Sequence, residues 1–161
     1  MNNLQIDACL KKCKSFHGTF PIDKMPPLDD KPYSCVLNLS PSGHSGTHWV
    51  ALFSRDDETV EYFDSYGRQM PGDIRACIGE RYAVRNNVIL QQLGSNVCGQ
   101  YCIYFVWNRD KGRPMKRIIA DFSKIDQKRN DSKVKLWVHK KFCYLPVGKG
   151  KELQICKAME P

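Results

Sequence analysis

Three side chains of the types used in nucleophilic catalysis stand where runs of apolar residues begin or end. His48 opens one apolar run, Asp64 closes the next, and Cys98 opens a third. A cysteine attacks as its thiolate, a neighbouring imidazole can remove the thiol proton, and a carboxylate can orient the imidazole. The sequence therefore predicts nucleophilic chemistry with Cys98 as nucleophile, His48 as general base and Asp64 as the orienting acid.

Such chemistry also requires hydrogen-bond donors that stabilise an oxyanion close to the nucleophile. The backbone N–H of Cys98 is one candidate, and the side-chain amide of Gln92, six residues upstream, is another. Gly99 leaves room beside the nucleophile for the backbone of a substrate. We therefore expect an oxyanion hole formed by Gln92 and Cys98, with Gly99 in contact with the substrate.

Each of these residues has a simpler structural explanation when it is taken singly. A histidine beside Trp49 is more often structural, Asp64 is a typical turn residue, and Cys98 alone is most simply a small buried thiol. His44 lies four residues before His48 and is an alternative base. The prediction rests on the combined order of histidine, acid, amide and cysteine.

Two strands must bring the histidine and the acid together. Residues 47–54 and 59–64 are apolar segments joined by a short polar turn, a pattern typical of a β-hairpin. Adjacent antiparallel strands would place His48 and Asp64 side by side on one face of a sheet.

A helix must carry the nucleophile to them. Residues 98–108 are strongly apolar and predict a buried helix, with Asn96 as its N-cap. Because the N-terminus of a helix stabilises an anion, this position would favour the thiolate of Cys98.

The remaining segments predict further helices and strands around this centre. In chain order we expect a helix over 3–15, an irregular loop over 16–30, a strand over 35–39, a helix over 73–79, a strand over 88–90, a helix over 115–124 and a helix capped by residues 130–132. The last helix would turn inward the side chains of Val134, Trp137, Val138 and Phe142. The expected fold class is therefore α+β, with a small mixed sheet flanked by helices. We expect one domain over 1–145 and a loosely ordered basic tail over 146–161.

Composition narrows the class of protein and its partners. The 161 residues are 42% hydrophobic and 26% charged, as in a single folded domain. The net charge of +8 favours a polyanionic partner, and DNA before a membrane. No segment is apolar for long enough to cross a membrane, and the first residues carry no secretory signal. We therefore expect an intracellular protein, located in the virion or the host nucleus if it is viral.

The chain contains eight cysteines. A reducing cell interior disfavours a disulfide framework, and the sequence contains no CxxC pair of the kind that binds zinc. We therefore expect most of these cysteines to be small buried residues, and we expect no metal site.

The segments that carry the candidate residues resemble the adenain and ubiquitin-like-protein protease superfamily. The nearer likeness is to adenain, the adenovirus protease, and to its relatives in Maverick/Polinton elements, over roughly residues 3–142. The matching motifs are Phe16-His17-Gly18-Thr19-Phe20, Ser34-Cys35-Val36-Leu37-Asn38, Gly46-Thr47-His48-Trp49-Val50-Ala51, Asp64, Gln92 and Cys98-Gly99.

The resemblance implies a papain-like fold, thiol protease activity and the catalytic and oxyanion roles named above. It also places Trp49 beside the active site, as a substrate-binding residue. Asp64 stands where adenovirus enzymes carry Glu, and Asp is usual in the deSUMOylase branch. No cofactor is implied for the chemistry itself. Adenovirus enzymes are stimulated by DNA and by a disulfide-linked peptide. Cys77 is the nearest candidate for the cysteine that forms this disulfide, and its position matches poorly. The basic charge is compatible with DNA stimulation.

Three classes of function follow from these observations. The first is an endopeptidase that cuts viral or element-encoded capsid and core precursors near Gly-rich sites. The second is a protease that removes a ubiquitin-like modifier, favoured by Asp64. The third is a basic DNA-binding module with an inert thiol, which fast alkylation of Cys98 that depends on His48 would exclude.

Overall fold

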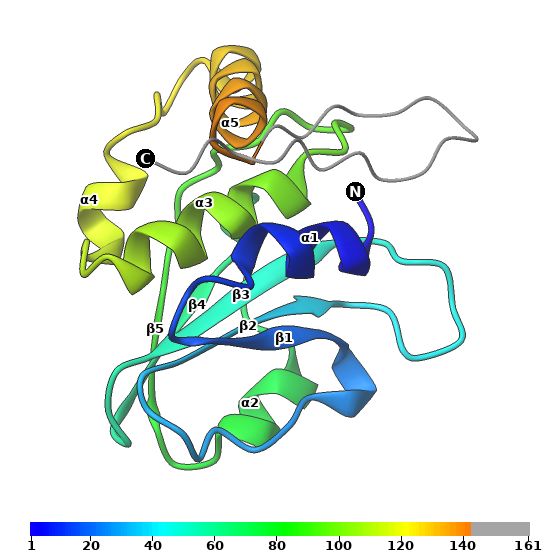
Figure 1. Cartoon of the computed structure of the whole chain (residues 1–161), viewed down its shortest axis with the longest axis vertical. Coiled ribbons are helices and arrows are strands. Elements are labelled where there is room, and N and C mark those ends of the chain that lie inside the picture. The colour runs from blue at the N-terminus through cyan, green and yellow to red at the C-terminus, as the bar shows by residue number, and fades with distance from the viewer. Residues whose placement is uncertain (143–161) are drawn as a thin grey trace.

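A five-stranded mixed sheet forms the centre of the computed structural model, which describes residues 1–142 (Figure 1). The strands follow one another across the sheet in chain order. The two outer pairs are parallel and the two inner pairs are antiparallel. The strands are β1 (Phe16–Pro21), β2 (Tyr33–Asn38), β3 (Trp49–Ser54), β4 (Thr59–Phe63) and β5 (Tyr82–Arg85).

Helices cover both faces of this sheet, so the predicted α+β class is confirmed (Figure 1). The helix that begins at Cys98 lies against β3 and is surrounded by the other helices of its face. On this face lie α1 (Asn3–Leu10), α3 (Cys98–Asp110), α4 (Met115–Ile119) and α5 (Gln127–Phe142), and on the other lie α2 (Gly72–Ile78) and the short 3-10 helix η1 (Ile22–Lys24).

The alternation of side chains along the strands divides the core in two. Val36, Ala51 and Phe63 face α3, and Phe63 stacks on Phe105 of α3 with ring centroids 4.6 Å apart. Since both faces of the central strands are buried, these strands appear in the sequence as nearly continuous apolar runs. The opposite face packs on α2 through Cys35, Leu37, Val50, Leu52, Tyr62, Ile74 and Ile78.

β3 and β4 form the predicted antiparallel hairpin. Ala51 pairs with Phe63 and Phe53 pairs with Glu61, so the polar turn lies at one end of the pair. This register places the residue before β3 and the residue after β4 at the other end of the sheet. His48 and Asp64 occupy those positions.

The prediction of an irregular loop over 16–30 is wrong for its first part. Residues 16–21 form β1, which pairs in parallel with the buried strand β2. Gly18 has a φ of 132° within the register irregularity between Phe16 and Thr19, and Pro21 closes the strand. Glycine and proline fit an edge strand at such positions, so tertiary pairing overrides their local loop preference.

The strand predicted over 88–90 is also wrong. The edge strand is formed instead by residues 82–85, which pair in parallel with β4. The backbone N–H groups of Leu90 and Gln91 both donate to Ser65 O, at 2.8 Å and 3.1 Å, and this holds the segment as a loop.

Several helix ends differ from their predicted positions. α1 ends at Leu10 and α4 at Ile119, each about a turn earlier than expected. α5 begins at Gln127 because Asp126 Oδ1 accepts the backbone N–H of Arg129 (2.9 Å), which is a capping bond. The predicted cap over 130–132 is therefore wrong, and Asn130 is buried inside the helix, where it donates to Leu90 O (3.0 Å).

The inward face predicted for α5 is confirmed, because Val134 and Val138 are buried and Trp137 and Phe142 pack against the core. The predicted tail over 146–161 and the last residues of the predicted domain lie outside the described residues. Within residues 1–142, no helix has the length and apolarity needed to cross a bilayer.

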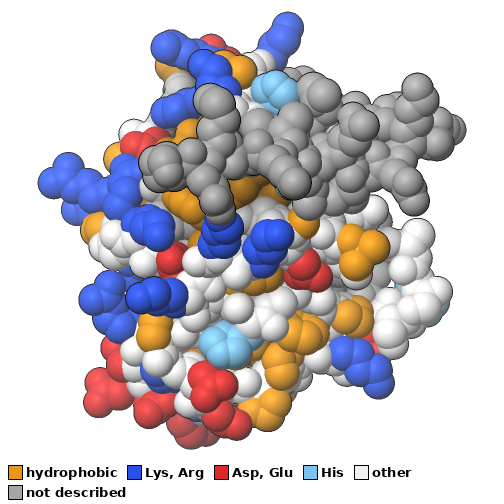
Figure 2. Space-filling model, viewed as in Figure 1, with side chains coloured by type: hydrophobic (Ala, Val, Ile, Leu, Met, Phe, Trp, Pro, Cys, Tyr) orange, Lys and Arg blue, Asp and Glu red, His pale blue; other side chains and the backbone are white. Residues whose placement is uncertain are grey.

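The charged side chains are unevenly distributed over the molecule. Figure 2 shows Lys and Arg side chains gathered over α4 and α5, and Asp and Glu side chains at the opposite end of the visible face. On this face, the basic side chains therefore lie mainly on the helical side of the molecule.

Candidate active site

His48 and Asp64 are in direct contact at the end of the β3–β4 hairpin. His48 Nε2 donates to Asp64 Oδ1 at 2.7 Å, and both side chains are buried. This bond leaves the other ring nitrogen, Nδ1, to face a second partner. That partner is Cys98, which interacts with the imidazole closely enough to raise its pKa.

The carboxylate of Asp64 is held in place from several directions. Its Oδ1 also accepts the backbone N–H of Tyr66 (2.8 Å). Asn86 pairs with the Asp64 backbone in both directions, since its Oδ1 accepts the N–H (2.8 Å) and its Nδ2 donates to the carbonyl (2.7 Å). Tyr66 then packs against the His48 ring, with centroids 5.1 Å apart. Within the described residues, Asp64 Oδ2 has no hydrogen-bond partner, whereas Oδ1 accepts from both the imidazole and the Tyr66 backbone.

Cys98 begins α3, as the sequence predicts, but the cap differs. The N-cap residue is Val97 and makes no side-chain capping bond, so the prediction of Asn96 as N-cap is wrong. The backbone N–H groups of Trp49 and Gly99 instead help to lower the pKa of Cys98. The start of this helix is thus left open for the thiolate to accept hydrogen bonds.

These contacts set the acidity of the two reacting groups. Burial disfavours the Cys98 thiolate, but the hydrogen bonds from His48 and from the Trp49 and Gly99 backbones outweigh it, so the pKa of Cys98 falls below the ordinary thiol value. Burial likewise disfavours a charged imidazole, yet hydrogen bonds to Asp64 and Cys98 raise the pKa of His48 to about 9. Both shifts favour a thiolate–imidazolium pair near neutral pH.

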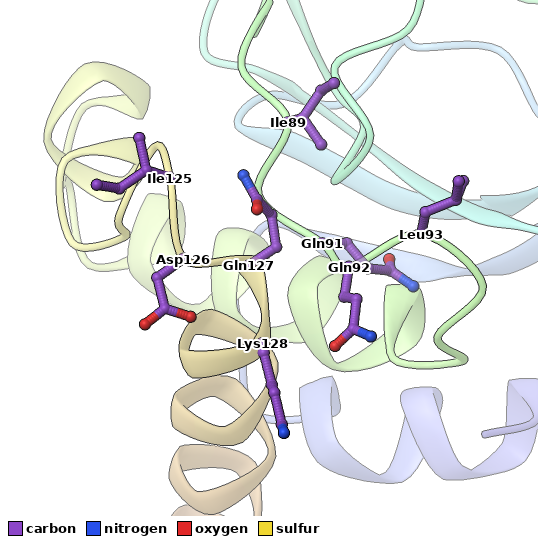
Figure 3. A pocket seen from close by; sticks show the side chains of 8 residues that line it. All are labelled: Ile89, Gln91, Gln92, Leu93, Ile125, Asp126, Gln127 and Lys128. Atoms are coloured by element: carbon purple, nitrogen blue, oxygen red, sulfur yellow. The ribbon is translucent and has the colours of Figure 1, made fainter.

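The two glutamines upstream of Cys98 have different environments. Gln91 is buried: its Oε1 accepts the Ser65 hydroxyl (2.6 Å), and its Nε2 donates to Ser95 O (2.8 Å). Gln92 is exposed, donates its backbone N–H to Asp131 Oδ1 (3.4 Å) and lines a surface groove (Figure 3). Gln91 therefore fixes the loop, whereas Gln92 has no side-chain hydrogen bond to any residue of 1–142.

Trp49 and Gly99, the two residues expected to contact substrate, both contact Met1. The indole Nε1–H of Trp49 donates to Met1 O (3.3 Å). A Cβ placed on Gly99 would lie 3.2 Å from Met1 Sδ and 3.3 Å from its Cβ. Met1 therefore packs directly on the surface beside Cys98.

The alternative base, His44, lies exposed in the loop before β3, whereas His48 is buried against the acid. The geometry thus favours His48. Within residues 1–142, no group of three or more His, Cys, Asp or Glu side chains is arranged to hold a metal ion.

Sequence reasoning did not anticipate several residues of this region. Tyr66 and Asn86 fix the acid, Gln91 fixes the loop before the nucleophile, and Met1 covers Gly99. The adjacency of Gln91 to Gln92 and the turn from Asp64 to Tyr66 were visible in the sequence, but the contacts of Asn86 and Met1 join segments whose pairing no local pattern reveals.

Comparison with solved structures identifies the fold. The structure superposes on the crystal structure of the African swine fever virus pS273R protease with a TM-score of 0.56 at 20% identity, over 83% of this chain and 65% of that one. The chain has the fold of a cysteine protease. The same fold matches the central domain of the uncharacterized protein Lpg1148 from Legionella pneumophila, with a TM-score of 0.54 at 11% identity over 88% of this chain and 97% of that one.

The sequence comparison reaches the same viral protein. The African swine fever virus protein named SUMO-1 cysteine protease S273R is 27% identical over 88 residues, which cover 46% of this chain and 32% of the relative. The chain thus matches about a third of the length of these curated relatives. No protein-family model matches the chain.

Proposed function

We propose that this protein is a cysteine endopeptidase that works through Cys98, His48 and Asp64. The observation that carries the proposal is the position of the His48 ring, which donates to the Asp64 carboxylate through Nε2 and has its pKa raised further by Cys98. The lowered pKa of Cys98 and the raised pKa of His48 support the same assignment. The shared fold with the pS273R protease adds support of an independent kind.

Acylation follows from the protonation states of the pair. The Cys98 thiolate attacks the scissile carbonyl carbon, and the electron pair of the C=O bond moves to oxygen. The backbone N–H of Cys98 and the amide of Gln92 would donate to this oxyanion. The His48 imidazolium then gives its proton to the leaving amine, the C–N bond breaks, and a thioester remains.

Deacylation uses the same groups, with His48 acting first as the base. Neutral His48 removes a proton from water, the hydroxide attacks the thioester carbonyl, and the C–S bond breaks as the thiolate leaves. Asp64 keeps the ring in one orientation and offsets its charge throughout both halves of the reaction. The product acid departs, and the thiolate–imidazolium pair is restored.

For substrates, we propose structural precursor proteins of a virus or mobile element, cut near Gly-rich sites. Trp49, Gly99 and Met1 crowd the surface beside Cys98, so little space is left there for a large side chain. A relative from a virus supports a viral setting, and for such a setting we propose the virion or the host nucleus as the location. The basic side of the molecule supports stimulation by DNA.

A second candidate function is removal of a ubiquitin-like modifier. The printed name of the viral relative, SUMO-1 cysteine protease, favours this candidate, as does an aspartate at the acid position. The third possibility, a DNA-binding module with an inert thiol, has only the basic surface in its favour. The buried His48–Asp64 pair and the lowered pKa of Cys98 count against it.

The deciding experiment compares wild type with Cys98→Ala. Purified protein is incubated with Gly-Gly-containing peptides, with and without double-stranded DNA, and separately with SUMO-1 that carries an electrophile at its C-terminus. We expect peptide cleavage by wild type that is absent in Cys98→Ala. A covalent SUMO-1 adduct without peptide cleavage would favour the modifier protease, and neither activity would contradict both.

A further inference from the structure

The loop that joins β2 to β3 delivers the proposed base to the site. It covers residues 39–48 and ends at His48, and the strands on either side of it pair up to Asn38 and Trp49. Residues 41–47 are exposed, and Figure 1 shows the loop projecting beyond the ends of the two strands. Because an exposed loop moves unless its base is fixed, the position of His48 depends on what closes the loop.

The side chain of Asn38 closes the base of this loop. Asn38 is buried, and its Oδ1 accepts two backbone N–H groups, from Ser40 (2.9 Å) and from Thr47 (3.3 Å). The hydroxyl groups of Ser40 and Thr47 are also bonded to each other, at 2.9 Å. One amide oxygen thus joins the first turn of the loop to the residue that immediately precedes His48.

Gly46 provides the space that this amide occupies. A Cβ placed on Gly46 would lie 2.2 Å from Asn38 Nδ2, which is far inside van der Waals contact. The φ angle of Gly46 is not in the left-handed region, so the requirement for glycine comes from this contact and not from the backbone conformation. Since Nδ2 is the end of a side chain, a larger residue at position 46 would displace the amide from the base of the loop.

The two residues after this base both act on the nucleophile. His48 and the backbone N–H of Trp49 each lower the pKa of Cys98. The carbonyl of His48 accepts the backbone N–H of Leu39 (3.0 Å), so the loop closes directly on the residue that carries the imidazole. Since a reacting group misplaced by about 1 Å can cost on the order of 100-fold in rate, closure of the loop bears directly on the chemistry.

We propose that Asn38 is a positioning residue for the reaction, which holds His48 against Cys98 by closing the loop before it. Gly46 belongs to the same device, because it leaves room for the Asn38 amide. The inference rests on the proposed function and adds to it a residue that acts through the backbone of the loop. The same closure fixes the backbone N–H of Trp49, so the imidazole and this N–H are positioned together.

The test measures how alkylation of Cys98 by iodoacetamide depends on pH in Asn38→Ala and in Gly46→Ala. The first variant removes the amide oxygen, and the second displaces it. In both, we expect the profile to move to higher pH by about one unit, with about tenfold slower reaction at every pH below the wild-type midpoint. Neither substitution adds or removes a titratable group, so the shift would report the placement of His48 and of the Trp49 N–H.

The double variant distinguishes one shared contact from two unrelated defects. If Gly46 is needed to accommodate the Asn38 amide, Gly46→Ala should have little effect once residue 38 is alanine. Asn38→Ala/Gly46→Ala should therefore have the profile of Asn38→Ala, whereas independent defects would add. The matched control is Gly72→Ala at the start of α2, where an added Cβ meets no atom of the described residues within 4 Å. This control should keep the wild-type profile.

Cleavage of Gly-Gly peptides gives a second readout under conditions where circular dichroism shows each variant to be folded. Asn38→Ala and Gly46→Ala should lose about tenfold in kcat with little change in KM, because the contact acts on the reacting groups and not on substrate binding. If Asn38→Ala does not fold, Gly46→Ala decides alone.

The proposal is wrong if the single variants keep the wild-type alkylation profile, or if their shifts add in the double variant. A loss of kcat in Gly72→Ala as large as in Gly46→Ala would also overturn it. Wild-type Cys98 that reacts like the exposed Cys77 at every pH would contradict the proposed function, and with it a residue that positions the pair.

Discussion

Two cysteines one helical turn apart on α3 have pKa values that are shifted in opposite directions. Burial raises the pKa of Cys102 well above the ordinary thiol value, whereas His48 and two backbone N–H groups lower that of Cys98. Cys35, which is also buried, has a pKa raised to about 12. The site therefore singles out one thiol among several by placing hydrogen-bond donors around it, and not by exposure alone.

The first prediction concerns alkylation of this thiol. Iodoacetamide should react quickly with Cys98 below pH 8, where an ordinary thiol with a pKa near 8.5 is mostly protonated. In His48→Ala, the reaction should move to higher pH, because burial raises the pKa of Cys98 and the imidazole that lowers it is gone. Mass spectrometry of the Cys98 peptide measures the rate, and Cys77, an exposed thiol in the same protein, serves as the reference. Equal profiles for wild type and His48→Ala would contradict the proposed pair.

The second prediction concerns the role of Asp64 in setting the pH range. Since the pKa of His48 is raised to about 9, the imidazolium needed by the leaving amine persists up to that pH, and kcat/KM should fall above it. In Asp64→Asn, the falling limb should move to lower pH, because the negative charge that raises the pKa is gone. The rate at pH 7 should drop by roughly 10²–10⁴.

The pH profile of kcat/KM for both proteins provides this measurement. The control is Asp56→Asn, which removes a carboxylate from the turn between β3 and β4, at the opposite end of the hairpin. An unchanged falling limb in Asp64→Asn would show that the carboxylate does not act through the imidazole.

The third prediction tests whether the side-chain amide of Gln92 acts as an oxyanion donor. Gln92→Ala should lower kcat by about 10²-fold, the usual cost of losing one oxyanion donor, while leaving the alkylation rate of Cys98 unchanged. The control is Gln127→Ala, which removes another amide that lines the same groove. If both variants behave alike, Gln92 has no special role in catalysis.

At the scale of elements, the site depends on how α3 is seated on the hairpin. His48 and Asp64 reach each other because the register of β3 and β4 brings the two strand ends together. Cys98 meets them because α3 packs along β3 and stacks its Phe105 ring on Phe63 of β4. Anything that loosens this contact should change stability first and chemistry as a consequence.

The fourth prediction follows from that contact. Phe105→Ala removes a fully buried ring between helix and sheet and should cost about 3–5 kcal/mol of unfolding free energy. Urea denaturation followed by circular dichroism measures it. The control Leu136→Ala, at an exposed position, should change stability by less than about 0.5 kcal/mol. A small effect for Phe105→Ala would mean that the core collapses around the missing ring.

At the scale of the whole molecule, the central elements were predictable and the edges were not. The apolar runs of β3, β4 and α3 carry strong patterns, which is why the positions of His48, Asp64 and Cys98 relative to them could be predicted. The edge strands β1 and β5 form because a buried neighbour offers them a partner, and no local pattern shows this. The same holds for contacts between distant segments, such as those of Asn86 with Asp64.

The contact of Met1 with Trp49 and Gly99 has a practical consequence for recombinant work. A purification tag joined ahead of Met1 would begin beside these two residues, within a short reach of Cys98. A tether of this kind holds its own peptide at an effective concentration on the order of millimolar, which dilute substrate cannot match. Tagged protein would then show a low rate because the tag competes with the substrate, so rates should be compared after the tag has been removed.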